Sequence, residues 1–470
     1  MTRKVNNNMD LVEQLDRIFH PRAIAVIGAS ANPDKVGTMC LRNLLKAGFG
    51  GKIYPVNPNL SELFGLRAYP SVSAIPGVID LAIIVIPAQL TTPTIEECAA
   101  KGVKGAILIT GGFKEVGTEI GSALQDKIRD IANRNGMKII GPNTLGFINP
   151  GANLNATFQP TVNSSKVGNV ALAAQSGGIC IFIIHALNNH NMGISKATGM
   201  GNRCNLDFDE VVTYFAKDEA TKVIVLYIEG LEQPQRLMNV ARQVVKRKPI
   251  VVYKSGRDET INRAALSHTG TLAGKYEFYK AAFTQAGMIA VDDMTELIDV
   301  TKALAFQPPS SGNRVAIITT QAGAGIIAAD KCRDLDLRPA EFSPATKQRL
   351  RQLVSPLTPI DNPVDIAWQA TDFDACREIL RVTMEDDGVD IITVITVYAP
   401  MIMEMMRAVI DISPSCKKPI TVCLDSPNGA ASAGINALEE RSIPTYPFPE
   451  RAITGLAGLA RYGKILKIIG

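Results

Sequence analysis

The chain has 470 residues, of which 46% are hydrophobic and 20% are charged, and its formal net charge at pH 7 is +4. This length predicts roughly two to four domains with large buried cores, and so small a net charge gives no reason to expect a nucleic-acid partner. No apolar run approaches the ~20 residues that a membrane helix needs, and residues 1–16 lack the apolar core of a secretion signal. The eight cysteines are scattered without CxxC spacing, so we interpret them as reduced packing thiols of a cytoplasmic protein without a metal site.

Short β-branched runs alternate with longer segments of helical period along the whole chain. This alternation predicts an α/β protein built from βαβ units, and runs that are apolar throughout predict parallel strands covered by helices on both faces. The first series of expected strands covers residues 23–27, 53–56, 81–86, 106–109 and 138–140. The second series covers residues 169–173, 194–197, 223–228 and 249–253. The third series covers residues 314–319, 391–397 and 419–424.

Two seams separate these series. Residues 148–168 are rich in Asn, Pro, Gly and Ser and show no periodicity, and residues 306–313 read as a Pro-Pro-Ser-Ser-Gly linker. We therefore expect three consecutive α/β domains, which cover residues 1–150, 151–307 and 312–470.

The first expected strand leads into a Gly-rich turn over residues 28–37, which contains Gly28, Ser30 and Gly37. Such a turn at the start of a helix offers backbone N–H groups and a positive dipole end to a phosphate. Its spacing is not GxGxxG, and the second strand ends at Asn57 rather than at the acidic residue that holds the ribose of NAD. CoA or another ADP-containing ligand fits this turn better than a nicotinamide cofactor, and a tight turn without a ligand is the alternative.

Other expected strands of the first domain also end in turn residues that can face a ligand. Pro87 follows the third strand, Thr110 and two glycines follow the fourth, and Asn143 follows the fifth. Each turn alone is ordinary chemistry for a strand end. Because open parallel sheets bind ligands at the carboxyl ends of their strands, together they indicate one crevice.

The second domain supplies three candidate parts of a phosphoryl-transfer site. The sequence Gln175-Ser176-Gly177-Gly178 joins a strand to a helix, and the bare N–H groups there suit an anionic phosphoryl group. Glu229 ends the strand over residues 223–228, and His268 lies in a loop of small residues over 264–274.

A histidine and a carboxylate at one sheet edge can carry out group transfer. The carboxylate fixes the tautomer of His268 by accepting one ring N–H, which leaves the other nitrogen free to attack phosphorus. Helix N-termini can then hold the negative charge of the phosphoryl group. The alternatives are a hydrogen-bonded loop histidine and a solvated Glu229, whereas His20, His185 and His190 have no comparable setting and are expected to be structural.

The third domain begins with another strand that feeds a Gly-rich helix start, which contains Gly323, Ala324 and Gly325. A Gly-rich helix N-terminus of this kind is compatible with a second anion-binding site, or with close packing of the helix against its neighbours.

The ordered motifs resemble one family over essentially the whole chain, and they read GAS…VG, NP, IPA, TGGF, GPN, QSGG and SHTGTLAG. They look like the α subunit of ADP-forming acyl-CoA synthetases, the acetate–CoA ligases that are relatives of succinyl-CoA synthetase. The resemblance implies a Rossmann-like CoA-binding domain followed by two flavodoxin-like domains. It implies a CoA site formed by Gly28, Ser30, Val36, Gly37, Asn57, Pro87, Thr110 and Asn143. It also implies that the helix start at Gly323, Ala324 and Gly325 faces the one at Ser176.

The chain departs from the family pattern at two positions. Many members carry a lysine where this chain has Asn59, so Lys35 is the candidate for the missing contact to a CoA phosphate. Many members also carry a hydroxyl residue where this chain has Ala367.

The resemblance also implies a reaction and a partner. Acyl-CoA and phosphate give acyl phosphate and CoA, His268 takes the phosphoryl group while Glu229 orients it, and a loop hinged at Gly270 and Gly274 carries it to ADP. No Walker A motif occurs in the sequence. In the family the ATP-grasp domain that binds ADP or ATP and Mg²⁺ lies either on the same, longer polypeptide or on a separate β subunit, and we expect a partner β subunit in an α2β2 assembly. The acyl group is not determined by the sequence.

Three other functions stay open at the level of sequence. A non-catalytic CoA-binding regulator could keep the same fold, and a CoA-dependent protein acyltransferase carries a similar CoA domain. An NAD-dependent dehydrogenase is the third, although the acidic ribose ligand is missing.

Overall fold

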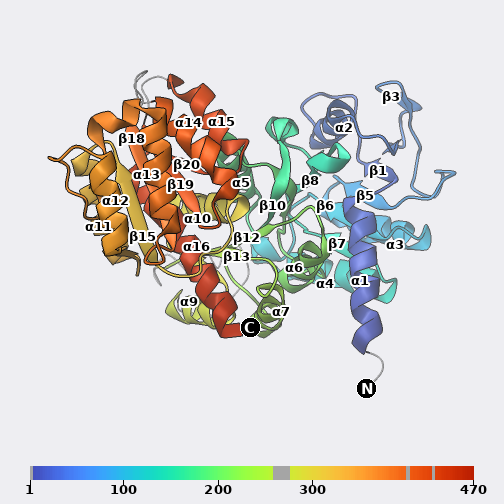
Figure 1. Cartoon of the computed structure of the whole chain (residues 1–470). Helices are drawn as coiled ribbons and strands as arrows, with labels where there is room; N and C mark the ends of the chain where they lie inside the picture. Colours follow the sequence, from blue (N-terminus) through green and yellow to red (C-terminus); the bar gives the residue numbers. More distant parts are fainter. Residues whose placement is uncertain (1–3, 258–275, 398–402, 426–428, 470) are drawn as a thin grey trace. The chain divides into compact units, whose positions relative to one another are not determined.

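The computed structural model describes residues 4–257, 276–397, 403–425 and 429–469 (Figure 1). The chain forms two compact units, Met1–Ala290 and Val291–Gly470. Parallel sheets connected by helices build both units, which confirms the predicted α/β class. Every strand that the sequence predicts is present, and its ends differ from the prediction by at most two residues. Within the described part of the chain, no helix combines the length and the apolar character needed to span a bilayer.

The first sheet of the Met1–Ala290 unit has the strand order β2-β1-β5-β6-β7, and all its neighbouring strands are parallel. Its strands are β1 (Ala23–Ile27), β2 (Lys52–Val56), β5 (Leu81–Ile84), β6 (Gly105–Leu108) and β7 (Lys138–Ile140). The accompanying helices are α1 (Lys4–Phe19), α2 (Val36–Ala47), α3 (Thr91–Ala100) and α4 (Glu119–Arg134). A short hairpin joins β3 (Glu62–Leu63) to β4 (Leu66–Arg67). The strand order reverses at β1, and such a switch point is where open α/β sheets bind ligands.

The second sheet of this unit has the strand order β14-β13-β12-β10-β11-β8-β9. Its strands are β8 (Gly146–Asn149), β9 (Leu154–Thr157), β10 (Val167–Ala174), β11 (Ile194–Gly199), β12 (Val223–Ile228), β13 (Ile250–Lys254) and β14 (Ile289–Val291). The accompanying helices are α5 (Gly177–Asn189), α6 (Phe208–Lys217), α7 (Pro234–Val244) and α9 (Tyr276–Gln285). β10 lies between β11 and β12, parallel to both, so this sheet has its switch point at the end of β10.

One seam expected from the sequence contains secondary structure. Residues 146–157 form the antiparallel pair β8–β9, and β8 adds this pair to the edge strand β11. The two strands are joined by a turn in which Asn153 has a φ of 51° and the Asn149 side chain accepts a hydrogen bond from the Ala152 N–H. Both strands contain asparagine, as does the turn between them, so the segment resembles a linker in composition and shows no apolar run.

The Val291–Gly470 unit contains a sheet of order β16-β15-β18-β19-β20, with β17 also paired to β15. Its strands are β15 (Arg314–Thr319), β16 (Arg338–Pro339), β17 (Val364–Asp365), β18 (Ile391–Val397), β19 (Ile420–Asp425) and β20 (Thr445–Tyr446). Its helices are α10 (Met294–Phe306), α11 (Ala322–Asp334), α12 (Pro344–Leu353), α13 (Phe373–Glu385), α14 (Met403–Ile412), α15 (Ser432–Glu439) and α16 (Pro449–Ile469).

Helix α10 packs within this second unit, although the sequence groups it with the preceding domain. The Asp299 carboxylate of α10 accepts a hydrogen bond from Arg451 of α16 at 2.7 Å, and the two side chains are 2% and 23% exposed. Lys302 of α10 reaches the Glu439 carboxylate at 2.5 Å, and both side chains are buried. Buried ion pairs of this kind tie α10 to the C-terminal helices.

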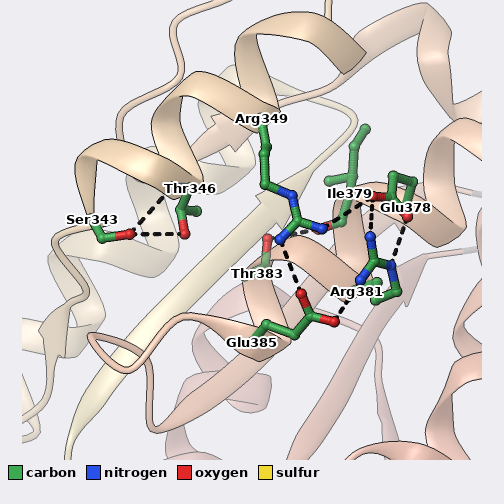
Figure 2. Close-up of polar contacts among 8 residues, drawn as sticks. All are labelled: Ser343, Thr346, Arg349, Glu378, Ile379, Arg381, Thr383 and Glu385. Atoms are coloured by element: carbon green, nitrogen blue, oxygen red, sulfur yellow. Dashed lines mark hydrogen bonds and ion pairs between the residues drawn. The ribbon is translucent and has the colours of Figure 1, made fainter.

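Helices α12 and α13 are joined on their surfaces by a network of charged side chains (Figure 2). Arg349 contacts both Glu378, at 3.3 Å, and Glu385, at 3.0 Å, and Arg381 contacts the same two carboxylates at 2.5 and 2.6 Å. Exposed ion pairs contribute roughly 0–1 kcal/mol each, so this network supports helix packing without determining it.

All eight cysteines are free thiols, and seven are buried. Burial raises the pKa of Cys40 to about 12. This state agrees with the interpretation of the cysteines as packing residues.

Candidate functional site

A cavity of about 1080 Å³ lies in the Met1–Ala290 unit and is lined by residues from both of its sheets. Its lining comprises Val36, Val85, Ile109, Thr110, Asn143, Thr144, Leu145, Phe158, Gln175, Ser176, Gly177, Gly178, Ile181, Gly201, Asn202, Tyr227, Glu229, Ser255 and Gly256. Most of these residues follow the carboxyl ends of strands. The predicted crevice of the first sheet and the predicted phosphoryl site of the second therefore share one space.

Part of the predicted CoA set lines the cavity, together with the predicted phosphate-binding residues and Glu229. The lining members of the prediction are Val36, Thr110, Asn143, Gln175, Ser176, Gly177, Gly178 and Glu229. Six members of the CoA set are not among the lining residues, and these are Gly28, Ser30, Lys35, Gly37, Asn57 and Pro87.

The Gly-rich turn after β1 is packed too tightly for side chains at its two glycines. A Cβ on Gly28 would lie 2.2 Å from the Val85 carbonyl oxygen, and one on Gly37 would lie 2.2 Å from the Gly28 carbonyl oxygen. The Asn57 side chain donates to the Ala29 carbonyl oxygen at 2.7 Å. These residues therefore shape the turn in front of α2, whose first residue lines the cavity.

The N-terminus of α2 has no side-chain cap. Lys35 occupies the N-cap position and its side chain makes no capping hydrogen bond. The Ser30 hydroxyl accepts a hydrogen bond from the Asn32 N–H at 3.1 Å and so organises the turn itself. The first N–H groups of α2 thus keep the anion-binding capacity that the sequence predicts for this turn.

Two of the predicted strand-end residues are fixed by hydrogen bonds to the backbone. Thr110 donates its hydroxyl to the Ile86 carbonyl oxygen at 2.7 Å, and the Asn143 N–H donates to the Thr110 carbonyl oxygen at 3.0 Å. Asn143 has a φ of 58°, a left-handed conformation that Asn tolerates. The carboxyl ends of β5, β6 and β7 are therefore linked into one rim.

Asn202 lines the cavity and connects the two sheets, a role that the sequence does not indicate. Its side-chain nitrogen donates to Glu115 at 2.5 Å and to Gln125 at 2.9 Å. The Glu115 carboxylate in turn accepts a hydrogen bond from the Gly112 N–H at 2.6 Å. This chain of contacts holds the turn after β6 against the segment that follows β11.

Helix α5 presents its N-terminus to the cavity. Ser176 is its N-cap, and the Ser176 hydroxyl accepts a hydrogen bond from the Ile179 N–H at 3.4 Å. A Cβ on Gly177 would meet Leu145 at 3.1 Å, whereas one on Gly178 would have only the Ser176 hydroxyl near it, at 3.9 Å. The first turn of α5 therefore offers N–H groups and a helix dipole to an anion, as predicted for a phosphate.

The peptide that follows Glu229 is held from two sides. Gln175 accepts hydrogen bonds on Oε1 from the N–H groups of Glu229 at 3.0 Å and Gly230 at 3.1 Å. Arg203 donates to the Gly230 carbonyl oxygen at 3.0 Å. Because Oε1 is occupied in this way, the orientation of the Gln175 carboxamide is fixed and its nitrogen is left to face other partners.

The Glu229 carboxylate is hydrogen-bonded to the Tyr227 phenol of the cavity wall. The Tyr227 phenol is hydrogen-bonded to both Glu229 and Ser255, and burial together with the Glu229 carboxylate raises the pKa of Tyr227 to about 12. The phenol is therefore protonated at neutral pH and donates to the carboxylate. A carboxylate held in this way can accept a further N–H.

His268 lies in residues 258–275, outside the described part of the chain. The described chain reaches this segment through Ser255 and Gly256, which line the cavity directly after β13. His20 and His185 each bond to a nearby side chain, His20 to Asp16 and His185 to Thr161, both at 2.9 Å.

The predicted anion-binding start of α11 lies in the other compact unit. Gln321 occupies its N-cap position without a side-chain hydrogen bond to the helix. A Cβ on Gly325 would lie 3.0 Å from Thr319 and Pro363, so this glycine serves close packing, whereas Gly323 has open space around it. Ala324 lies between them, within the first turn of the helix.

Several lining residues escaped the sequence reasoning. Ser255 and Gly256 follow a predicted strand and could have been found by the rule that located Glu229. Phe158 lies in the seam that was expected to be a linker, and Leu145 and Ile181 are apolar residues without any distinguishing pattern. Only the three-dimensional structure brings these side chains to the cavity.

Three family models match consecutive parts of the chain. A CoA binding domain matches residues 22–150, a succinyl-CoA ligase like flavodoxin domain matches residues 167–304, and a ligase-CoA domain matches residues 315–465.

Curated relatives match nearly the whole chain. The acetate–CoA ligase [ADP-forming] II subunit alpha of Pyrococcus furiosus is 39% identical, over 96% of this chain and 98% of the relative. The acetate–CoA ligase [ADP-forming] I of Archaeoglobus fulgidus is 38% identical over 96% of this chain, which spans 64% of that longer relative.

A solved structure has the same fold over almost the entire chain. It is acetyl-coenzyme A synthetase 1 of Ca. Korarchaeum cryptofilum, described as dinucleotide forming and in complex with phosphate and ADP. The TM-score is 0.89 and the identity 35%, with 97% of this chain and 98% of that chain covered. These findings confirm the family that the ordered motifs predict. The chain therefore belongs to the family of α subunits of ADP-forming acetate–CoA ligases, whose domains are like those of succinyl-CoA ligase.

Proposed function

We propose that this chain converts acyl-CoA and phosphate into a carboxylic acid and CoA, and passes the phosphoryl group to ADP on a partner. The observation that carries the proposal is the single cavity whose lining includes Thr110 and Asn143 of the predicted CoA site, the α5 N-terminus at Ser176 and Glu229. Such a cavity allows a thioester and a phosphate to meet at reacting distance. Every step is reversible, so the same site serves acyl-CoA synthesis.

In the first step, a phosphate oxygen attacks the thioester carbonyl carbon. The carbon–sulfur bond breaks, acyl phosphate forms, and CoA leaves as its thiol. The N–H groups at the start of α5 and the Ser176 hydroxyl hold the phosphate, because a helix N-terminus stabilises negative charge.

In the second step, one imidazole nitrogen of His268 attacks the phosphorus of the acyl phosphate. The bond between phosphorus and the acyl oxygen breaks, and the carboxylic acid leaves as its carboxylate. Glu229 accepts the N–H of the other ring nitrogen and stabilises the positive charge on the phosphorylated ring. The nitrogen–phosphorus bond then breaks as an oxygen of ADP takes the phosphoryl group.

The nucleotide is proposed to bind a separate β subunit with an ATP-grasp domain, in an α2β2 assembly, with Mg²⁺ bound beside it. The support is that the P. furiosus relative is named a subunit alpha and that the A. fulgidus relative is longer than this chain. Within this chain we propose three domains, over residues 1–150, 151–307 and 312–470, in which α10 ends the sequence of the second domain but packs with the helices of the third. We also propose a cytoplasmic location. The proposed site on the third domain is the start of α11 at Gly323, Ala324 and Gly325.

The phosphohistidine is tested by incubating the full chain with acetyl-CoA and radioactive inorganic phosphate. We expect an acid-labile, base-stable label on the wild-type chain and none on His268→Ala. Binding of CoA, measured by calorimetry, should be equal in both proteins. A label of wild-type intensity on His268→Ala would remove His268 from its proposed role.

The partner is tested by assaying the purified chain alone with ATP, acetate and CoA. We expect no acetyl-CoA until a second subunit is added. Formation of acetyl-CoA by the isolated chain at a catalytic rate contradicts the proposed division of labour.

A further inference from the structure

A buried lysine stands beside the proposed site, and the mechanism above does not use it. Lys254 is the last residue of β13, and it pairs in register with Ile228, the residue before Glu229. Lys254 is only 2% exposed. A cation is thus built into the end of the strand adjacent to the one that carries the Glu229 carboxylate.

The contacts of Lys254 hold its ammonium group in place without neutralising it. Nζ donates to the Ser255 carbonyl oxygen and lies 4.9 Å from the centroid of the Tyr279 ring. The Tyr279 hydroxyl accepts a hydrogen bond from the Leu231 N–H at 3.2 Å, which fixes the ring against the segment after β12. Among the described residues, no carboxylate lies within ion-pair distance of Nζ, although the Glu229 carboxylate is near enough to stabilise its charge.

The charges of the cavity explain why a cation is needed there. Among the described lining residues, Glu229 is the one with a charged side chain, and it is acidic. Phosphate and the phosphoryl group are also anions, so each must enter against the repulsion of Glu229. In a site of low dielectric constant such repulsion is large unless a nearby cation balances it.

We propose that Lys254 is a positioning residue of the phosphoryl-transfer site, whose buried ammonium keeps Glu229 ionised and balances the charge of the incoming phosphate. This inference rests on the proposed function. Lys254 does not line the cavity, so it acts through the field of its charge and through Glu229.

The proposal predicts a loss of phosphate binding at alkaline pH. Burial lowers the pKa of Lys254 to about 8, although the nearby Glu229 carboxylate opposes this shift. The titratable groups that face the ammonium among the described residues are the Glu229 carboxylate, which directly follows β12, and the Tyr279 phenol of α9. Below pH 8 the ammonium is charged, and its charge is lost as the pH rises through this pKa, well before an exposed lysine would lose its proton.

The test measures the binding of inorganic phosphate to the full chain by calorimetry, at pH values from 6.5 to 9.5 chosen to bracket that pKa. We expect wild-type affinity to fall as the pH rises through about 8. Lys254→Met should bind phosphate about tenfold or more weakly at neutral pH, without the alkaline decrease. Lys254→Arg keeps a charge at every pH in this range, so it should restore binding and also lack the decrease.

Lys196→Met is the matched control. Lys196 is equally buried at 2%, belongs to the same sheet, and contacts Asp218 at 2.9 Å. It is not among the residues that line the cavity. Its removal should lower the melting temperature because Asp218 loses its buried cation and keeps only the hydrogen bond from Thr221 and the more distant Lys248 charge. It should leave phosphate affinity and its pH profile unchanged.

A stability measurement separates the proposed role from a structural one. The pKa of Lys254 is lower in the folded chain than in the unfolded chain, so the unfolded chain binds more protons between pH 8 and 10.5. The free energy of unfolding therefore rises with pH over this range. Burial of the charged ammonium therefore costs stability at neutral pH, and Lys254→Met should have an unchanged or higher melting temperature.

The outcomes distinguish this inference from the function on which it rests. Equal phosphate affinity and pH profile in wild type and Lys254→Met overturn the role of Lys254, even where His268 is labelled as proposed. A loss of phosphate binding accompanied by a lower melting temperature identifies a structural role and also overturns it. If Lys254 controls phosphate binding while no label forms on His268, the inference holds and the phosphohistidine step is wrong.

Discussion

The carboxamide of Gln175 links the ends of two strands at the proposed site. From the end of β10 it accepts two N–H groups of the segment that carries Glu229, at 3.0 and 3.1 Å. The position of Glu229 therefore depends on a residue that the sequence assigns only to phosphate binding. Gln175 is 5% exposed, so water does not readily replace it.

Replacing Gln175 by leucine should disturb both stability and phosphorylation. The substitution leaves the two N–H groups without their acceptor, at a cost of about 1–3 kcal/mol each, and it frees Glu229 to move. We expect a lower free energy of unfolding and a slower labelling of the full chain by acetyl-CoA and radioactive phosphate. Gln175→Glu keeps an acceptor but buries a second carboxyl group beside Glu229, so it should also lower stability and slow labelling, and its loss of stability should shrink as the pH falls and the added carboxyl takes up a proton. Wild-type stability and labelling in Gln175→Leu would show that the two hydrogen bonds do not matter.

A comparison of alanine substitutions at Gly28 and Gly48 measures how much the tight packing of the Gly-rich turn contributes to stability and CoA binding. Both have a positive φ, 89° and 77°, but a Cβ on Gly28 meets the Val85 carbonyl at 2.2 Å whereas one on Gly48 meets nothing within 4 Å. Gly48→Ala should cost about 1–2 kcal/mol from backbone conformation alone. Gly28→Ala should cost about 1–3 kcal/mol more because of the overlap, and it should also weaken CoA binding because the turn shifts. Equal losses in urea unfolding, with equal CoA affinity, contradict a tightly packed turn.

At the scale of single residues, the sequence predicted the site residues that directly follow an apolar run, and it missed those that do not. Ser176 and Glu229 directly follow apolar runs, so the rule about carboxyl ends of parallel strands found them. Asn202 and Phe158 also line the cavity, but Asn202 follows a strand by three residues and Phe158 belongs to an irregular segment. Their positions depend on how the two sheets of the unit pack, which no local pattern encodes.

At the scale of elements, buried strands were predictable and boundary elements were not. Strands such as β1 and β12 are apolar and buried throughout because helices cover both faces of their sheets, and this composition is visible in the sequence. The pair β8–β9 was missed because its strands read GFIN and LNAT, so asparagine interrupts the apolar run that marks the other short strands. Helix α10 falls within the bounds of the second predicted domain, but its partner α16 lies more than a hundred residues later, so its packing could not be inferred from neighbouring sequence.

The contact between α10 and α15 gives a prediction about stability. Lys302 and Glu439 form a buried pair at 2.5 Å, and Lys302 also donates to the Thr445 carbonyl oxygen at 2.8 Å. Lys302→Met leaves the Glu439 carboxylate buried without its cation, which should cost about 3–5 kcal/mol. The double variant Lys302→Met with Glu439→Leu should recover most of this loss.

The control for this prediction is an exposed pair on a neighbouring helix. Arg333 and Asp330 of α11 lie 2.9 Å apart with side chains 78% and 67% exposed. Arg333→Ala should change the free energy of unfolding by roughly 0–1 kcal/mol. If thermal unfolding gives similar losses for Lys302→Met and Arg333→Ala, the buried pair does not stabilise the unit.

At the scale of the whole molecule, the compact units divide the chain between Ala290 and Val291. The linker predicted from the sequence lies later, at residues 306–313, where Pro308, Pro309 and Gly312 interrupt the pattern. This segment leaves α10 and then leads into β15. It is bonded to α16, because the Ser310 N–H donates to the Leu459 carbonyl oxygen at 3.2 Å. Linker-like composition here marks a tight connection inside a unit.

This difference predicts which C-terminal fragment folds. A fragment of residues 291–470 contains α10 and keeps its contacts to α16, including the ion pair between the buried Asp299 and the half-buried Arg451. A fragment of residues 312–470 lacks α10, so it exposes the apolar surface of α16. It also removes Asp299 and Lys302, the partners of Arg451 and Glu439. We expect cooperative thermal unfolding for the longer fragment, and a lower melting temperature or aggregation for the shorter one. Equal melting temperatures for the two fragments would place α10 outside the fold of the second unit and return the boundary to residues 306–313.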